Sequence, residues 1–378
     1  MAKRIGTLLL AILLAVAIAG GTTALADSRP RVFDLIQDIT SCAVPESGEQ
    51  LVQRNLYRET VNNVEITVLE AGYDGRSLFL CYSFRMLDVD EPLGATAADI
   101  YGDDLPEGMD PDMYIDGYVG GDGEELLYNH NVGWWIDDIW FNGKPMSDMP
   151  EGSGQYVTGT EVPGELIETD IWRLDQVGVF LEGKVKISLP VGERQDLADY
   201  YSGGHPEKYD EDGQLKLPEA GMVTFEYDAG DILSTIRVVQ QETETVLPAV
   251  TVKVREAAFT PLMTYVTLDL DVNPDALAAF IAENGEGPQD DDGEIMWEYG
   301  GMDVFGDWLE DLGLADGDGN LLFPGYYGPD IYGDNDAYFL CPAMTELPET
   351  LYLAPPEDEN KADLTQGIQI LPETVPAQ

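Results

Sequence analysis

The chain has 378 residues, of which 44% are hydrophobic and 10% aromatic, so it can build the cores of two or three domains and is not disordered throughout. Lys and Arg number 19 against 72 Asp and Glu, which gives a formal net charge of −53 at pH 7. That field attracts cations, basic proteins and cationic wall polymers and repels polyanions, so it excludes nucleic acid and anionic membrane surfaces as partners.

Residues 1–26 have the pattern of an export signal. Lys3 and Arg4 give a positive start, an apolar run follows, and Ala24 and Ala26 supply the small side chains that a signal peptidase binds. The alternative is an uncleaved membrane anchor, because the run and its Gly/Thr extension approach the roughly 20 residues of a spanning helix. We therefore predict an exported protein, secreted or held at the cell surface.

Residues 27–50 are predicted to form a short helix and a lead-in. Apolar residues recur there at helical spacing, at Val32, Leu35, Ile36 and Ile39. This periodicity predicts an amphipathic helix over Arg31 to Ile39, and Pro30 suits its first turn, where an N–H is not needed.

From Leu51 onward the periodicity becomes that of strands. Val64 to Val68 alternates between apolar and polar residues, a turn follows over Tyr73 to Arg76, and Ser77 to Phe84 reads as the returning strand. These residues predict a β-hairpin.

Two further strands and two loops are expected in the rest of the first half. The strands cover Val177 to Leu189 and Met222 to Tyr227. The stretches Asp88 to Gly123 and Tyr200 to Gln214 are acidic and rich in Gly and Pro, which predicts irregular loops.

One segment of the sequence occurs twice. Val64 to Phe84 aligns without a gap on Val250 to Leu270. The matched pairs are Val64/Val250, Ile66/Val252, Val68/Val254, Glu70/Glu256, Ala71/Ala257, Tyr73/Phe259, Phe79/Tyr265, Leu80/Val266, Tyr82/Leu268 and Phe84/Leu270. Because the apolar period, the turn and the Glu-Ala pair coincide, we predict two related β domains.

The repeat sets the predicted domain boundaries. The first domain, with acidic loop insertions, covers residues 51–240, the second covers residues 241–357, and a flexible tail covers residues 358–378. The polar stretch Arg237 to Val246 is the expected linker. Short strands at turn-punctuated spacing predict an all-β fold of two immunoglobulin-like antiparallel β-sandwich domains with one or two short helices. The second helix is expected over Pro274 to Glu283.

This order of elements resembles a known family. An apolar segment and a short helix precede "NNVEITVLEAGYDGRSLFLCYSF" (Asn62 to Phe84), and the second domain begins "AVTVKVREAAFTPLMTYVTLDL" (Ala249 to Leu270). The layout is similar to extracytoplasmic domains of unknown function in Gram-positive membrane proteins related to anti-sigma factors. There a β domain is followed by an immunoglobulin-like domain. The resemblance implies an extracytoplasmic location and brings no catalytic residues.

The resemblance has one departure. The His/Cys zinc-bearing cytoplasmic segment of an anti-sigma factor would precede the apolar run, where this sequence has only Met1 to Arg4. Direct control of a sigma factor is therefore not implied.

The sequence contains no recognisable catalytic motif. A nucleophilic or zinc site would need His130, His205 or one of the three scattered cysteines. We find no GxSxG elbow, HExxH, CxxC or Walker loop, so we predict that the protein is not an enzyme. Because carboxylates are so numerous, a hydrolase with a non-standard carboxylate site remains a third hypothesis.

The cysteines are Cys42, Cys81 and Cys341. An odd number at scattered positions is no disulfide framework. We expect Cys81 and Cys341 to be buried apolar residues in strands, and a disulfide between them is the alternative.

One loop has the beginning of a calcium-binding pattern. Asp316, Asp318 and Asn320 place oxygen-bearing side chains at alternate positions, as the start of an EF-hand loop does. Leu321 and Tyr327 stand where that loop needs Gly and a bidentate Glu. We therefore favour an Asp-Gly-Asn hairpin turn and predict no cofactor, with calcium as the alternative.

Three tryptophans form an aromatic cluster. Trp134, Trp135 and Trp140 would suit the stacking of sugar rings or of a cation. At strand period Trp134 and Trp140 share one face and Trp135 lies on the other, so neither face is a clean ligand stripe. Packing in a sandwich core is the favoured interpretation.

We therefore expect an exported, non-catalytic β-sandwich module that binds or senses a partner at the cell surface. Its partner would be a protein or another cell-envelope component of unknown identity. The alternative is a calcium-dependent or carbohydrate-binding adhesion module.

Overall fold

The computed structural model describes residues 31–40, 42–98, 111, 114–119, 127, 129–134, 139–146, 154–194, 222–240, 244–247, 250–273, 275, 278–279, 312–323, 330–332, 336–358 and 360–371. Within these ranges no helix is long and apolar enough to cross a membrane. The export signal expected over residues 1–26 lies outside them.

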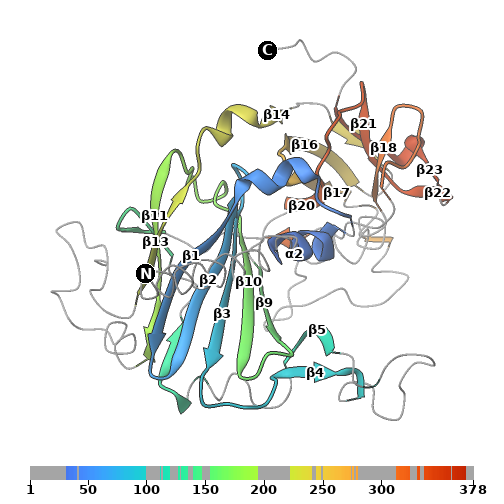
Figure 1. The fold of residues 1–378 in the computed structure, drawn as a ribbon. Coiled ribbons are helices and arrows are strands. Elements are labelled where there is room, and N and C mark those ends of the chain that lie inside the picture. Colours follow the sequence, from blue (N-terminus) through green and yellow to red (C-terminus); the bar gives the residue numbers. More distant parts are fainter. Residues whose placement is uncertain are drawn as a thin grey trace, which may run out of the picture.

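The first half of the chain forms two antiparallel sheets around one core (Figure 1). One sheet has the strand order β1-β2-β3-β10-β9 and the other β13-β11-β7-β8. Their bounds are β1 Val52–Val61, β2 Val64–Tyr73, β3 Leu78–Met86, β7 Trp140–Phe141, β8 Lys144–Pro145, β9 Gly154–Gly159, β10 Glu165–Trp172, β11 Lys184–Leu189 and β13 Val223–Asp228. Both sheets contribute fully buried side chains to the first core cluster, for example Val64, Leu80 and Ile187.

The second half repeats this plan. One sheet has the order β14-β16-β17-β20-β19, with β15 also paired to β16, and a three-stranded sheet has the order β18-β21-β24. Their bounds are β14 Arg237–Val239, β15 Glu244–Val246, β16 Val250–Phe259, β17 Met263–Val272, β18 Gly313–Asp316, β19 Asp330–Tyr332, β20 Asp336–Pro342, β21 Leu351–Ala354 and β24 Ile368–Leu371. A second core cluster takes side chains from both sheets, so the predicted all-β sandwich fold is confirmed.

Short elements join the larger sheets. They are the pairs β4 Gly94–Thr96 with β5 Tyr114–Val119, β6 Val132–Trp134 with β12 Val191–Glu193, and β22 Pro356–Asp358 with β23 Lys361–Ala362, and the 3-10 helices η1 Glu46–Leu51, η4 Ile232–Thr235 and η5 Leu364–Gln366.

The internal repeat appears in the structure as two equivalent hairpins. The register of β2 with β3 shifts between Val68 and Glu70, and the register of β16 with β17 shifts between Val254 and Glu256. Such a β-bulge exchanges the two faces of a strand. Beyond it the inward residues are therefore Ala71 and Tyr73 in one copy, and Ala257 and Phe259 in the other.

A helix lies between the two halves. The apolar side of α2 Arg31–Thr40, including the 1%-exposed Phe33, packs into a third cluster. That cluster also takes outward side chains of β3 and β10 from the first half and of β17 and β20 from the second, among them the repeat equivalents Phe79 and Tyr265. Figure 1 shows α2 close to β20 and to the right of the upper part of the five-stranded sheet. The two halves therefore share part of their core.

Several predicted elements are confirmed and one is shortened. The helix, the hairpin over Val64 to Phe84 and the strand near Met222 to Tyr227 are present as α2, β2–β3 and β13. The strand expected over Val177 to Leu189 begins only at Lys184. Gly178 and Gly183, with φ of 69° and 58°, turn the chain sharply before that point.

The predicted flexible tail over residues 358–378 is wrong up to Leu371. There β24 pairs with β21, and Ile368 and Ile370 are fully buried in the second core cluster. Apolar residues at alternate positions thus continue the sandwich beyond the predicted end at residue 357.

Two segments expected to be irregular contain strands. The linker over Arg237 to Val246 forms β14 and β15, which pair with β16, because Val239 turns into the second core cluster. The loop over Asp88 to Gly123 contains the paired strands β4 and β5. The loop over Tyr200 to Gln214 lies outside the described residues, and so does most of the helix expected over Pro274 to Glu283.

Candidate functional site

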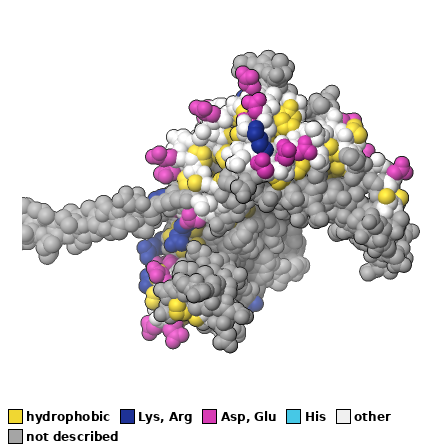
Figure 2. Space-filling view, turned by 90° about the vertical axis from the view of Figure 1, so that its right-hand side faces the viewer, with side chains coloured by type: hydrophobic (Ala, Val, Ile, Leu, Met, Phe, Trp, Pro, Cys, Tyr) yellow, Lys and Arg dark blue, Asp and Glu magenta, His cyan; other side chains and the backbone are white. Residues whose placement is uncertain are grey.

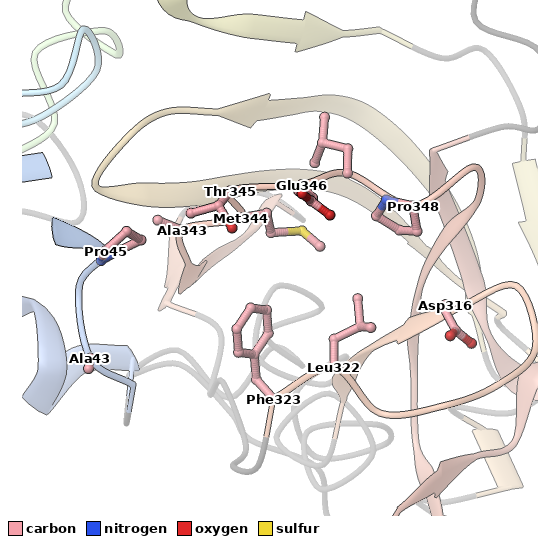
Figure 3. A pocket seen from close by; sticks show the side chains of 11 residues that line it. Ala43, Pro45, Asp316, Leu322, Phe323, Ala343, Met344, Thr345, Glu346 and Pro348 are labelled. Atoms are coloured by element: carbon pink, nitrogen blue, oxygen red, sulfur yellow. The ribbon is translucent and has the colours of Figure 1, made fainter. Parts of the chain in front are cut away.

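A groove of about 510 Å³ opens on the second half of the molecule. It lies where the segment after α2, the turn after β18 and the loop after β20 meet. The lining residues are Ala43, Pro45, Asp316, Leu322, Phe323, Ala343, Met344, Thr345, Glu346, Leu347 and Pro348. In Figure 3, Leu322 and Phe323 point toward Met344 on the facing wall, with Pro45 at one end of the groove and Asp316 at the other.

The apolar walls of the groove are anchored in the core. Leu322, Phe323, Met344 and Leu347 are partly buried and pack against the second core cluster with their inner sides. The turn after β18 delivers Leu322 to this place, because its backbone N–H donates to the carbonyl of Leu314 at 2.8 Å. The groove therefore presents fixed apolar surface rather than loose side chains.

Two carboxylates stand beside this apolar surface. Glu346 is exposed on one wall, and Asp316 lies at the far end with part of its side chain in solvent. Although partial burial works against it, hydrogen bonds from Asn320 and Asp318 and the charge of Lys361 hold the pKa of Asp316 below its ordinary value. The Asp316 carboxylate is therefore ionised at neutral pH. The groove combines apolar contact surface with negative charge.

Figure 2 shows one face of the molecule. Acidic side chains are spread over its upper part, between hydrophobic ones, and few basic side chains are visible among them. The many acidic side chains agree with the net charge of −53. The protein that carries the groove therefore attracts cations.

The residues proposed for calcium form a tight turn. The Asp316 carboxylate accepts hydrogen bonds from the backbone N–H groups of Asp318 and Asn320, at 3.0 and 2.8 Å, and from the Asn320 amide at 2.7 Å. The Lys361 ammonium donates to the carbonyl of Asp318 and to Asn320 Oδ1. A calcium ion would have to displace this lysine.

Within the described part of the chain no group of three or more His, Cys, Asp or Glu side chains is arranged to hold a metal ion.

One of the three tryptophans proposed for stacking is buried. Trp140 on β7 is 1% exposed and belongs to the interior of the first half, so it cannot stack on a ligand ring. Trp135 and the side chain of Trp134 lie outside what the structure describes.

The histidines and cysteines form no nucleophilic pair in the described residues. His130 contacts Asp88, with 2.7 Å between Nε2 and Oδ1, and His205 lies outside the described ranges. Cys42, Cys81 and Cys341, all within the described residues, are not joined by a disulfide. Cys81 belongs to the cluster around α2 and Cys341 to the second core cluster, which leaves no place for a disulfide between them.

Two buried carboxylates occupy the inner face of β10. Glu168 and Asp170 are each 1% exposed, and the Tyr82 hydroxyl donates to Asp170 at 3.0 Å. Burial raises the pKa of Asp170 to about 7, against hydrogen bonds from Tyr82 and Trp172 that lower it. A carboxylate pair that cleaves glycosides must meet its substrate, and side chains without solvent contact do not offer that surface.

A polar network joins the two halves. Asp74, in the turn between β2 and β3, is fully buried and accepts from Thr260 Oγ1 at 2.6 Å and from the Tyr265 hydroxyl at 2.8 Å. Thr260 occupies the repeat position equivalent to Asp74. The Arg173 guanidinium lies 4.8 Å above the Tyr265 ring and 5.4 Å from the Tyr338 ring. These contacts fix the halves against each other and offer no exposed binding surface.

Comparison with known proteins adds little. No family model matches the chain, and no curated protein sequence matches it. A solved structure described as the conserved domain protein from Bacillus anthracis is similar over 86% of this chain and 85% of its own, with 11% sequence identity and a TM-score of 0.39. A similarity of that degree supports no statement about the site.

The groove was not found from the sequence. Its walls come from segments far apart in the chain, after α2, β18 and β20, and each contributes only two to six residues. The signal present in the sequence is weak: Leu322, Phe323, Met344 and Leu347 are apolar residues that lie outside the strands.

Proposed function

We propose that this protein is an exported, non-catalytic β-sandwich module that binds a partner protein at the cell surface, and that the groove between Pro45 and Asp316 is its binding surface. The observation that carries the proposal is the fixed apolar surface of Leu322, Phe323 and Met344, which remains open to solvent. Protein interfaces place such apolar anchors at the centre of a polar rim. The export pattern of residues 1–26 supports the location.

A photo-crosslinking experiment tests the binding surface. A photoreactive phenylalanine analogue replaces Phe323 in the full chain, produced in its native host, and in a matched protein replaces Phe180, which is 54% exposed on the first half. We expect a crosslinked protein specific to position 323. The same products from both positions would contradict the proposal.

The partner identified in this way is then purified and its binding to the module measured directly. Met344→Ser removes apolar surface in the groove, and Leu87→Ser removes it at a 49%-exposed position elsewhere. We expect Met344→Ser to weaken binding about tenfold, as the loss of one interface anchor does, and Leu87→Ser to leave it within about twofold. Equal effects of the two substitutions would place the interface elsewhere.

A further inference from the structure

We propose that the groove receives an extended segment of the partner protein in which an aliphatic or aromatic side chain stands two residues from a Lys or Arg, on the same face of the segment. This inference rests on the proposed function, because it specifies the chemistry of the segment that the groove binds.

The preference for an aliphatic or aromatic side chain follows from the side chains that form the groove walls. Leu322 and Phe323 face Met344 across the groove, and all three rest on the second core cluster. A volume of about 510 Å³ lies in the range of sites that enclose several side chains or a small ligand. Methionine adapts its shape to different apolar partners, so Met344 accepts either an aliphatic or an aromatic side chain.

The preference for a Lys or Arg follows from the charges of the residues that line the groove. The lining contains Glu346 and Asp316 and neither Lys nor Arg. The Asp316 carboxylate is held by three hydrogen bonds within its own turn and contributes negative charge at one end, which the nearby Lys361 ammonium partly offsets. Glu346 is exposed on the wall that also carries Met344 and is available to pair with an incoming cation. An anionic or neutral apolar segment would bury this carboxylate unpaired, which is costly.

The combination of apolar surface and negative charge favours a protein segment as the occupant of the groove, over a metal ion or a cationic polymer. A metal ion needs several oxygen ligands at one point, and the groove separates its two carboxylates along an apolar wall. A cationic polymer without apolar groups would leave the surface of Phe323 and Met344 exposed. In an extended peptide, alternate side chains lie on the same face about 6.6 Å apart, so an apolar residue and a cation two residues away reach the two kinds of surface together.

Three labelled peptides of about eight residues test the proposal on the folded protein. The first contains Phe, two Leu and two Lys; the second has Glu in place of Lys; the third has Ser in place of Phe and Leu. Binding is followed by fluorescence anisotropy at about 150 mM salt, where weak surface electrostatics are screened. We expect the first peptide to bind at least about tenfold more tightly than either of the others.

A pair of charge reversals locates the binding. Glu346→Lys lies in the groove, and Glu349→Lys makes the same change at an exposed position three residues farther along that is not part of the lining. We expect Glu346→Lys to weaken binding of the basic apolar peptide about tenfold and Glu349→Lys to weaken it less than about threefold. Circular dichroism confirms that both variants are folded.

The outcomes separate the two proposals. If the Lys peptide without apolar residues binds as tightly, or if both charge reversals act equally, binding is general attraction to an acidic protein and the inference fails. If the Glu peptide binds most tightly and Met344→Ser weakens it, the groove binds proteins but the basic requirement is wrong. If no peptide binds and crosslinking at position 323 yields no specific partner, the proposed function fails as well.

Discussion

Asp170 shows how one residue makes the stability of this protein depend on pH. Its side chain is 1% exposed on β10, with Tyr82 and Trp172 as hydrogen-bond donors and the Glu168 carboxyl nearby on the same strand face. Burial raises its pKa to about 7, whereas an aspartate in an unfolded chain titrates near pH 4, about its ordinary value. Between these values the folded protein retains a proton that the unfolded chain releases. The stability contributed by protonated Asp170 is therefore lost as pH rises from about 4 through about 7.

Asp170→Asn is expected to remove this dependence. The amide has no proton to lose, so the variant gains stability relative to wild type as pH rises, by up to about 1.4 kcal/mol per pH unit. Urea unfolding at about pH 5 and about pH 8 measures the difference. Asp228→Asn, an exposed carboxylate on β13, is the matched control and should follow wild type. An Asp170→Asn variant that parallels wild type at both pH values would show that Asp170 is ionised in the fold.

At the scale of a single element, the hairpin β2–β3 depends on one glycine in its turn. Gly75 has φ of 94°, and a Cβ built there would lie 2.0 Å from Ile236 Cδ1. Gly143, in the turn between β7 and β8, has φ of 79° with nothing within 4 Å of such a Cβ. Both positions require left-handed backbone, and only the buried Gly75 has a neighbour in the way of a Cβ, so comparing them separates backbone strain from steric conflict.

We expect Gly143→Ala to lower the free energy of unfolding by about 1 to 2 kcal/mol, because the alanine Cβ disfavours the left-handed backbone at this position. Gly75→Ala should cost a further 1 to 3 kcal/mol or so, from the collision with Ile236. Chemical denaturation of both variants provides the measurement. The double substitution Gly75→Ala with Ile236→Ala should recover much of the additional cost. Equal costs for the two single variants would mean that the chain near Ile236 moves aside freely.

The elements that the sequence predicted well are those with their own periodic pattern. α2 and the two repeated hairpins carry complete apolar periods, and the shift of that period at Glu70 and Glu256 records the bulge. The strands found in segments expected to be irregular include β4, β5, β14, β15 and β24, and of these all but β5 have only three or four residues. The groove was missed as well, because its walls meet only when the second half is assembled. Patterns confined to three or four residues do not specify such contacts.

At the scale of the whole molecule, the repeated sheets pack so that equivalent residues meet. Phe79 and Tyr265 share one cluster with α2, and Asp74 bonds to its repeat equivalent Thr260. Contacts between equivalent positions are typical of two-fold interfaces between identical subunits. Here both copies lie in one chain. A core shared by both halves predicts that they unfold together rather than one after the other.

Asp74→Ala tests this coupling. The substitution removes the acceptor for Thr260 and Tyr265 and for two backbone N–H groups of its own turn, all in a fully buried place, so we expect a loss of about 2 to 4 kcal/mol. Hydrogen exchange followed by mass spectrometry compares β3 with β17. In wild type both should exchange with the same opening free energy, and in Asp74→Ala the two values should separate because each half then opens alone. Asp363→Ala removes an exposed carboxylate with a similar role in its own turn but no bond between halves, and should keep the two values equal. If β3 and β17 already differ in wild type, the shared cluster does not make the halves a single cooperative unit.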